Sequence, residues 1–169
     1  ISAACIGEEI HMNNQKAIVT GASRGIGRGI ALSLARAGYD LAISYCTKEE
    51  EARKLKETIE SEYHSQCHIF RASLEQPGEG KAFFHKAVNA LGGLDLLVNN
   101  AGVTVFENIL ELSEDAMRKL ISLDFINYLC MMQQAAVYMK EHGIKGSITS
   151  KFRRIWLNKD TWGADEKNR

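Results

Sequence analysis

The sequence predicts an α/β fold with three layers, in which helices cover both faces of a parallel sheet. Between residues 15 and 150, short apolar runs of strand length alternate with amphipathic helical patterns. A glycine-rich turn joins the first apolar run to the first helical pattern. The 169 residues are 45% hydrophobic, which is enough for one globular domain with a core. Right-handed crossovers between the strands would place helices on both sides of the sheet.

The first three strands are short and apolar, as is typical of strands that are buried on both faces. Residues 17–20 predict the first strand, 41–43 the second and 68–70 the third. Between the first two strands, apolar residues at helical spacing predict a helix that runs from Ile26 to a C-terminal cap at Gly38.

The next two helices are predicted from a cap and from apolar spacing. Thr47, with Glu50 three residues later, predicts a capping box that begins a charged surface helix reaching Glu62. Apolar residues around 83–88 predict a further helix, which closes near the glycine pair at 92–93.

Two strands and a long helix end the alternating region. Residues 94–98 predict the fourth strand and 145–150 the fifth. Ser113 is a favourable N-cap for a helix over 113–142, and acidic residues in its first turn suit the positive end of the helix dipole. The apolar positions of this helix include Met117, Leu120, Ile121, Phe125, Leu129, Met132, Ala136 and Met139.

The ends of the chain differ from this pattern. Residues 1–14 predict an unstructured leader, and Met12, the first methionine, stands directly before the first strand signal. The first ten residues lack the basic flank and apolar block of a secretory signal. Residues 151–169 have no usable period and predict a divergent tail, which leaves 15–150 as the folded domain.

Charge and cysteine content argue against several classes of protein. With 21 basic and 21 acidic residues the net charge is zero, so we expect neither nucleic acid nor a membrane surface as partner. No apolar run approaches the roughly 18 residues of a membrane span. Four cysteines without framework spacing are typical of the cytoplasm. His64, Cys67 and His68 have no second cluster to complete a tetrahedral site, so no metal is expected.

The residues that carry chemistry follow the first strand. Residues 20–27 read Thr-Gly-Ala-Ser-Arg-Gly-Ile-Gly. Gly21 permits a tight exit from the strand, Gly25 leaves room for a pyrophosphate, and Gly27 allows close packing of helix and strand. The N-terminus of the following helix offers N–H groups and partial positive charge to phosphates. A glycine-rich structural turn is the alternative, but the strand–turn–helix context predicts a Rossmann-type, dinucleotide-binding domain over 15–150.

This glycine spacing resembles that of the short-chain dehydrogenase/reductase family. A second family signature, Asn-Asn-Ala-Gly at residues 99–102, stands at the end of the fourth strand. The resemblance covers residues 15–150, the N-terminal part of the family's fold, and is closest to 3-oxoacyl-(acyl-carrier-protein) reductases and related sugar or steroid dehydrogenases. It implies an oxidoreductase acting on small carbonyl or alcohol substrates, in which the asparagine pair pins the central strands and lines the cofactor cleft.

The expected cofactor is NADP(H), with NAD(H) less favoured. NAD-specific enzymes of this architecture carry an acid after the second strand, and no acid stands at that point here. Arg24 can bond a 2′-phosphate, a role that the resemblance supports, although a solvated surface arginine is the alternative. Cys46 stands where many NADP-dependent relatives have a second arginine, and Ser73-Leu74 replace the family's adenine-contacting aspartate. The predicted cofactor-binding residues are Gly21, Ser23, Arg24, Gly25, Ile26, Gly27, Tyr45, Ser73, Leu74, Asn99, Ala101 and Gly102.

The catalytic part of the family pattern is absent. The family's proton donor is a tyrosine whose pKa is lowered by a lysine four residues later, and none of the five tyrosines here has such a lysine. The family's relay asparagine aligns with Asp124, and Asn127 would substitute only if the helix shifted register. Ser150 is the nearest candidate for the catalytic serine, and it is not assigned.

Three interpretations remain open. The first is an NADP(H)-binding family member without the C-terminal strands, left catalytically incomplete by a frameshift, a truncation or divergent splicing near Lys151. The second is a non-catalytic nucleotide-binding or interaction protein, with the helix over 113–142 as a candidate surface for homo-oligomers or partners. The third is a non-functional fragment that folds poorly.

Overall fold

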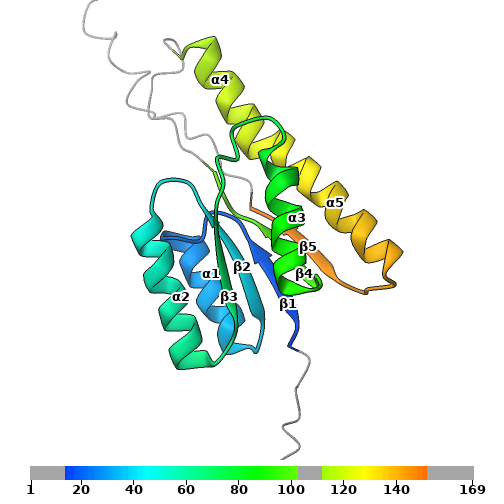
Figure 1. Ribbon diagram of the computed structural model, residues 1–169. Coiled ribbons are helices and arrows are strands. Elements are labelled where there is room, and N and C mark those ends of the chain that lie inside the picture. The colour runs from blue at the N-terminus through cyan, green and yellow to red at the C-terminus, as the bar shows by residue number, and fades with distance from the viewer. Residues whose placement is uncertain (1–13, 103–111, 152–169) are drawn as a thin grey trace, which may run out of the picture.

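The computed structural model describes residues 14–102 and 112–151, which form one sheet with helices on both faces (Figure 1). The strands are β1 (Lys16–Val19), β2 (Asp40–Tyr45), β3 (Cys67–Arg71), β4 (Leu96–Asn99) and β5 (Ser147–Ser150). They pair in the order β3-β2-β1-β4-β5, and every pair is parallel. This is the strand order of doubly wound, Rossmann-type sheets, so the predicted fold class is confirmed. Of the predicted leader and tail, only residues 14 and 151 are described.

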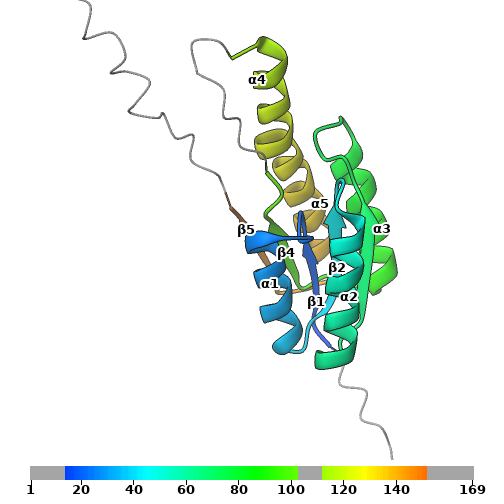
Figure 2. The ribbon, with the colours of Figure 1, turned by 90° about the vertical axis from the view of Figure 1, so that its left-hand side faces the viewer.

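Two pairs of helices cover the two faces of the sheet (Figure 2). These helices are α1 (Gly25–Arg36), α2 (Glu49–Tyr63), α3 (Glu79–Leu91) and α5 (Asn127–Glu141). Side chains alternate along a strand, so Ala17 and Val19 of β1 pack with α1 and α2, whereas Ile18 packs with α3 and α5. Because both faces are covered, these three side chains are fully buried. This explains why the strands read as continuous apolar runs.

The β5 strand ends the described sheet on one side, with β4 as its neighbour there. Ser147 and Thr149 are exposed, and Ile148 is half-buried. The exposure of β5 contrasts with the full burial of β1, because β1 lies between two other strands and β5 does not. No further strand pairs with its outer edge among the described residues, and an edge strand presents backbone N–H and C=O groups.

Glycine and serine caps delimit three helices as predicted. Gly38 follows α1 with a φ of +85°, and Gly92 ends α3 with a φ of +67° while its N–H donates to the Val88 carbonyl. Ser113 caps α4 (Glu114–Ile121), where its hydroxyl oxygen accepts from the Ala116 N–H at 3.2 Å. The left-handed backbone at both glycines is the conformation that only glycine adopts without strain.

The predicted capping box of Thr47 and Glu50 is wrong. Helix α2 begins at Glu49, with Lys48 in the N-cap position, and no side chain there bonds to the first backbone N–H groups. Thr47 therefore lies one residue too early to act as the cap. The first turn instead carries Glu49, Glu50 and Glu51, whose charges are favourable near the positive end of the helix dipole.

The helix predicted over 113–142 is continuous but not regular. A π-helical turn, η1 (Ser122–Ile126), separates α4 from α5. A π turn contains an extra residue, so it rotates all later side chains relative to α4. Of the eight apolar positions predicted for this helix, only Met139 is buried, and the others are exposed or half-buried. The buried large side chains of η1 and α5 include Leu123, Tyr128, Met131 and Met139.

The opposite side of this helix exposes much of its apolar surface. Met117 is 40% exposed, and Ile121, Phe125 and Leu129 are each about half exposed at intervals of four residues. Val137 and Ile126 add to this surface. In the described ranges, no helix combines the length and the apolar character needed to cross a bilayer.

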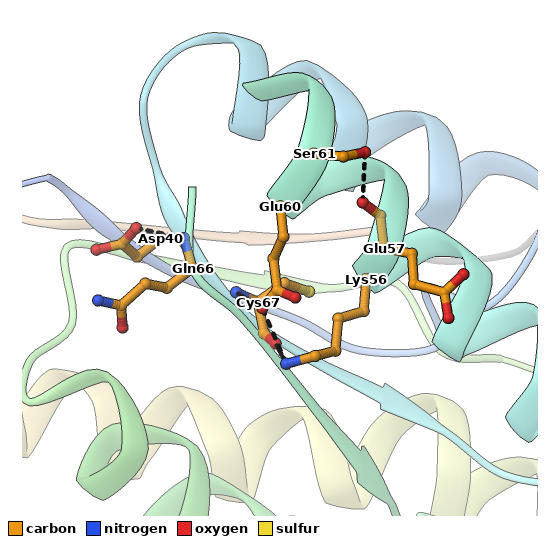
Figure 3. Close-up of polar contacts among 7 residues, drawn as sticks. All are labelled: Asp40, Lys56, Glu57, Glu60, Ser61, Gln66 and Cys67. Carbon is orange, nitrogen blue, oxygen red and sulfur yellow. Dashed lines mark hydrogen bonds and ion pairs between the residues drawn. The ribbon is translucent and has the colours of Figure 1, made fainter. Parts of the chain in front are cut away.

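Figure 3 shows how α2 is joined to β3. Lys56 donates a hydrogen bond to the Cys67 carbonyl at 2.7 Å and pairs with Glu60 at 2.9 Å. Burial raises the pKa of the Cys67 thiol to about 12, so this thiol is protonated at neutral pH. Among the residues that the structure describes, no group of three or more His, Cys, Asp or Glu side chains is placed to hold a metal ion.

Candidate functional site

A cavity of about 510 Å³ opens at the carboxyl ends of β1, β2, β3 and β4. The chain leaves β1 toward one side of the sheet and β4 toward the other, and open α/β sheets bind ligands at such a point. Most of the predicted cofactor-binding residues line the cavity: Gly21, Ser23, Arg24, Gly25, Ile26, Gly27, Leu74, Ala101 and Gly102.

The glycine turn shapes one wall of the cavity. Gly21 has a φ of +63°, and a Cβ there would lie 2.8 Å from the Ala101 Cα. Gly25 has a φ of +58°, and a Cβ there would meet no atom within 4 Å, so this position borders open space. A Cβ at Gly27 would overlap the Gly21 carbonyl oxygen and the Asn100 amide. Gly27 therefore allows α1 to pack closely on the turn and on the end of β4.

A buried hydrogen-bond network holds the turn after β1 to the turn after β4. The Thr20 hydroxyl oxygen accepts from the backbone N–H groups of Asn100 and Ala101, both at 2.9 Å. The Asn100 side-chain amide donates to the carbonyls of Thr20 at 2.9 Å and Gly21 at 3.1 Å. Thr20 is fully buried and Asn100 nearly so. The network thus fixes the two turns that form the floor of the cavity.

The two asparagines of the second motif have different positions. Asn100 lines the cavity, as the network requires. Asn99 is fully buried behind it, and its amide donates to the Ser150 hydroxyl at 3.2 Å across the β4–β5 pair. Its side-chain oxygen has no hydrogen-bond partner among the described residues. Asn99 therefore joins two strands and does not line the cavity.

Tyr45 and Ser73 also lie outside the cavity wall. Tyr45 is buried, and burial together with the neighbouring Glu49 carboxylate raises its pKa. Cys46, the next residue, lines the cavity instead, and its sulfur is 3.9 Å from the Ser73 hydroxyl oxygen. Ser44 also lines the cavity, so the extended chain alternates: Ser44 and Cys46 face the cavity, and Tyr45 between them points away.

The cavity has a positive rim that the motifs alone do not indicate. Lys48, Lys119 and Lys151 line it together with Arg24, whereas Glu75 is the acidic residue on its wall. The sequence contained the signal for Lys48, which follows the second strand closely. The other two lysines come from distant segments, so sequence spacing could not place them here.

The predicted relay position is in the π turn. Asp124 lies in η1, is half-buried and does not line the cavity. The register shift that would bring in Asn127 is present, but Asn127 is buried and its amide donates to the Leu74 carbonyl. Asn127 therefore does not take the relay role. Ser150, at the end of β5, accepts from Asn99.

Comparisons with known proteins assign the family. The sequence model of the short chain dehydrogenase family matches residues 15–150. The chain belongs to this family. L-rhamnose 1-dehydrogenase (NADP(+)) of Thermoplasma acidophilum is 34% identical over 139 residues, which cover 82% of this chain and 54% of that enzyme. A 3-oxoacyl-(acyl-carrier-protein) reductase of Staphylococcus aureus is 36% identical over 125 residues, which cover 74% and 50% of the two chains.

A solved structure shows the same similarity in three dimensions. The crystal structure of a short chain dehydrogenase from Burkholderia cenocepacia in complex with NADP matches with a TM-score of 0.74 and 31% identity. The match covers 80% of this chain and 54% of that one. This member of the family thus spans about half the length of the relatives that it matches.

The Thr20 network should be a main source of stability in this short-chain dehydrogenase domain. Thr20→Val keeps the shape of the side chain but leaves two buried N–H groups without an acceptor. At about 1–3 kcal/mol for each unpaired group, the free energy of unfolding should fall by about 2–6 kcal/mol. Urea denaturation followed by circular dichroism would measure this. Thr149→Val, on an exposed strand position, is the matched control, and an equal loss in both variants would contradict the role of the network.

Replacing each of two glycines of α1 by alanine should have opposite effects on stability. Gly27→Ala should destabilise the protein by at least about 2 kcal/mol, because the new methyl group overlaps backbone and amide atoms. Gly29→Ala meets open space and should stabilise the same helix by about 0.5–1 kcal/mol. Thermal denaturation of both variants would show opposite shifts in Tm. A stabilised Gly27→Ala variant would mean that the turn and α1 do not pack as described.

Proposed function

We propose that this chain binds NADP(H) across the carboxyl ends of β1 to β4. The observation that carries the proposal is the glycine turn, which leaves open space at Gly25 directly at the N-terminus of α1. The free N–H groups of that helix end and its partial positive charge suit a pyrophosphate. A side chain at Gly25 would project into the space that the phosphates need.

The charges around the cavity favour the phosphorylated cofactor. Arg24 occupies the N-cap position of α1, where its side chain is exposed and lines the cavity. Lys48 lines the cavity three residues after the end of β2, and the acid that NAD-specific enzymes of this architecture carry after this strand is absent. We propose that these two cations bond the 2′-phosphate. Two similar proteins support this choice: the Thermoplasma enzyme is an L-rhamnose 1-dehydrogenase (NADP(+)), and the Burkholderia dehydrogenase was crystallised in complex with NADP.

The predicted residues would have three different roles around the cofactor. Gly21, Ser23, Ile26, Gly27, Ala101 and Gly102 would form the cradle for the pyrophosphate and the nicotinamide half. Leu74 would contact the adenine, because it follows β3, next to the strand end that holds the adenosine ribose. Tyr45, Ser73 and Asn99 would support these residues from behind the wall.

A bound nicotinamide cofactor supplies hydride chemistry, but the residues for the proton are incomplete in these 169 residues. A tyrosine and lysine four residues apart are absent, and Asp124 takes the place of the relay asparagine. We therefore propose a nucleotide-binding domain of a carbonyl or alcohol oxidoreductase that is catalytically incomplete by itself. Its four scattered cysteines support a cytoplasmic location.

A second function, association through α4 and α5, is favoured by one observation. Ile121, Phe125 and Leu129 form a stripe of half-exposed apolar side chains along η1 and the flanking helices. Such a surface lowers its free energy when another helix covers it. We propose that copies of the chain, or a partner, associate here.

Arg24 gives the test of cofactor preference. Arg24→Ala should weaken NADPH binding by about 1.5–3 kcal/mol, the scale of a hydrogen bond to a charged group, and leave NADH binding nearly unchanged. Isothermal titration of both nucleotides would measure this. Arg36→Ala, an exposed arginine at the other end of the same helix, is the control. A parallel loss for both nucleotides would show that Arg24 has a structural role instead.

Catalysis gives an independent test. The purified chain should bind NADPH, seen as a change in nucleotide fluorescence, yet should not oxidise it with a panel of ketones, aldehydes and 3-oxoacyl thioesters. The physical reason is the missing acid that protonates the carbonyl oxygen as hydride arrives. Absorbance at 340 nm would follow the reaction. Steady turnover would show that another residue donates the proton and would overturn the incomplete-enzyme proposal.

A further inference from the structure

Two polar side chains join the π turn to the loop between β3 and α3. The Ser122 hydroxyl donates to the Glu75 carbonyl at 2.7 Å. The Asn127 amide donates to the Leu74 carbonyl, and its side-chain oxygen accepts from the Gly80 N–H at 3.2 Å. Together these bonds form a latch that joins the π turn to the loop and to Gly80 in the first turn of α3.

The π turn is what allows both side chains to take part. Ser122 and Asn127 are five residues apart, and in a regular α-helix they would point in clearly different directions. In the π turn the Asn127 N–H donates to the Ser122 carbonyl, so the two residues lie one turn apart on the same face of the helix. The Asn127 amide also donates to that carbonyl, at 3.0 Å. Asn127 is 4% exposed, so its bonds form away from competing water.

Gly80, in the first turn of α3, leaves space for the latch. A Cβ at Gly80 would lie 2.6 Å from the Asn127 side-chain oxygen, so only glycine leaves room for that bond. The two loop carbonyls that the latch holds belong to Leu74 and Glu75, and both of these residues line the cavity. The latch therefore fixes the part of the cavity wall that follows β3.

We propose that Ser122 and Asn127 are positioning residues for the base of the bound nucleotide. They hold Leu74 and Glu75 in the place where this wall contacts the adenine. The inference rests on the proposed function, because the strand end next to this loop is the one that holds the adenosine ribose. Neither side chain lines the cavity, so both act through the loop.

The test uses adenosine 2′,5′-bisphosphate, which carries the base and the 2′-phosphate without the nicotinamide half. Ser122→Ala should lower its affinity by about fivefold, equivalent to one net hydrogen bond. Ser122→Thr keeps the hydroxyl and should restore most of the affinity. Asn127→Asp keeps the acceptor for the Gly80 N–H, but an ionised aspartate cannot donate to the Leu74 carbonyl. The affinity of this variant should therefore fall at least as much as that of Ser122→Ala. Isothermal titration would give the three affinities.

Ser61→Ala is the matched control, because the Ser61 hydroxyl also donates to a backbone carbonyl at 2.7 Å, that of Glu57 in α2 (Figure 3). It should leave the affinity unchanged. Hydrogen exchange provides a readout without ligand: amides of residues 73–78 should exchange faster in Ser122→Ala and at the original rate in Ser61→Ala.

The outcomes separate the two proposals. If the wild-type chain does not bind the bisphosphate, the proposed function is wrong. If the wild-type chain binds it and Ser122→Ala binds equally well, the latch is wrong and the proposed function stands. Unchanged exchange at residues 73–78 in Ser122→Ala would also overturn the latch. A fivefold loss that threonine restores, with faster exchange, supports it.

Discussion

The hydrogen bonds between Thr20 and the turn at Asn100 are the interaction on which the rest of the site depends. Two chain segments leave neighbouring strands in opposite directions, and without a connection the gap between them would have no fixed shape. The buried threonine hydroxyl and asparagine amide supply that connection. Gly21 and Gly27 then fit against it with no space for a side chain. The strand order and these few polar groups therefore fix the shape of the cavity.

The charges around this cavity bear on the ligand that is proposed for it. Among the described residues, four cations and one acid line it, although the whole chain has no net charge. Positive charge is therefore concentrated at the cavity, where the N-terminus of α1 adds the partial positive charge of its helix dipole. Arg24 and Lys48 come from the loops after two neighbouring strands, so the 2′-phosphate of the proposed cofactor would lie between them.

The helix that contains the π turn serves two surfaces at once. Its inner side packs on α3 and holds the loop after β3 through Ser122 and Asn127, whereas its outer side exposes Ile121, Phe125 and Leu129. A regular helix could not present both sets, because the extra residue in the turn is what rotates α5 relative to α4. If another helix covered the exposed side, it would therefore also restrain the contacts that Ser122 and Asn127 make with the loop after β3.

The sequence by itself determined the fold class, the two motifs that follow the first and fourth strands, and the helix ends at Gly38, Gly92 and Ser113. These features depend on local conformation and on apolar spacing. The tertiary structure decided the rest. It showed that Lys119 and Lys151 reach the cavity, that Asn99 lies behind it, and that a π turn rotates the last helix. Such features arise when distant segments pack together, and no periodicity along the chain encodes which side chains will then be neighbours.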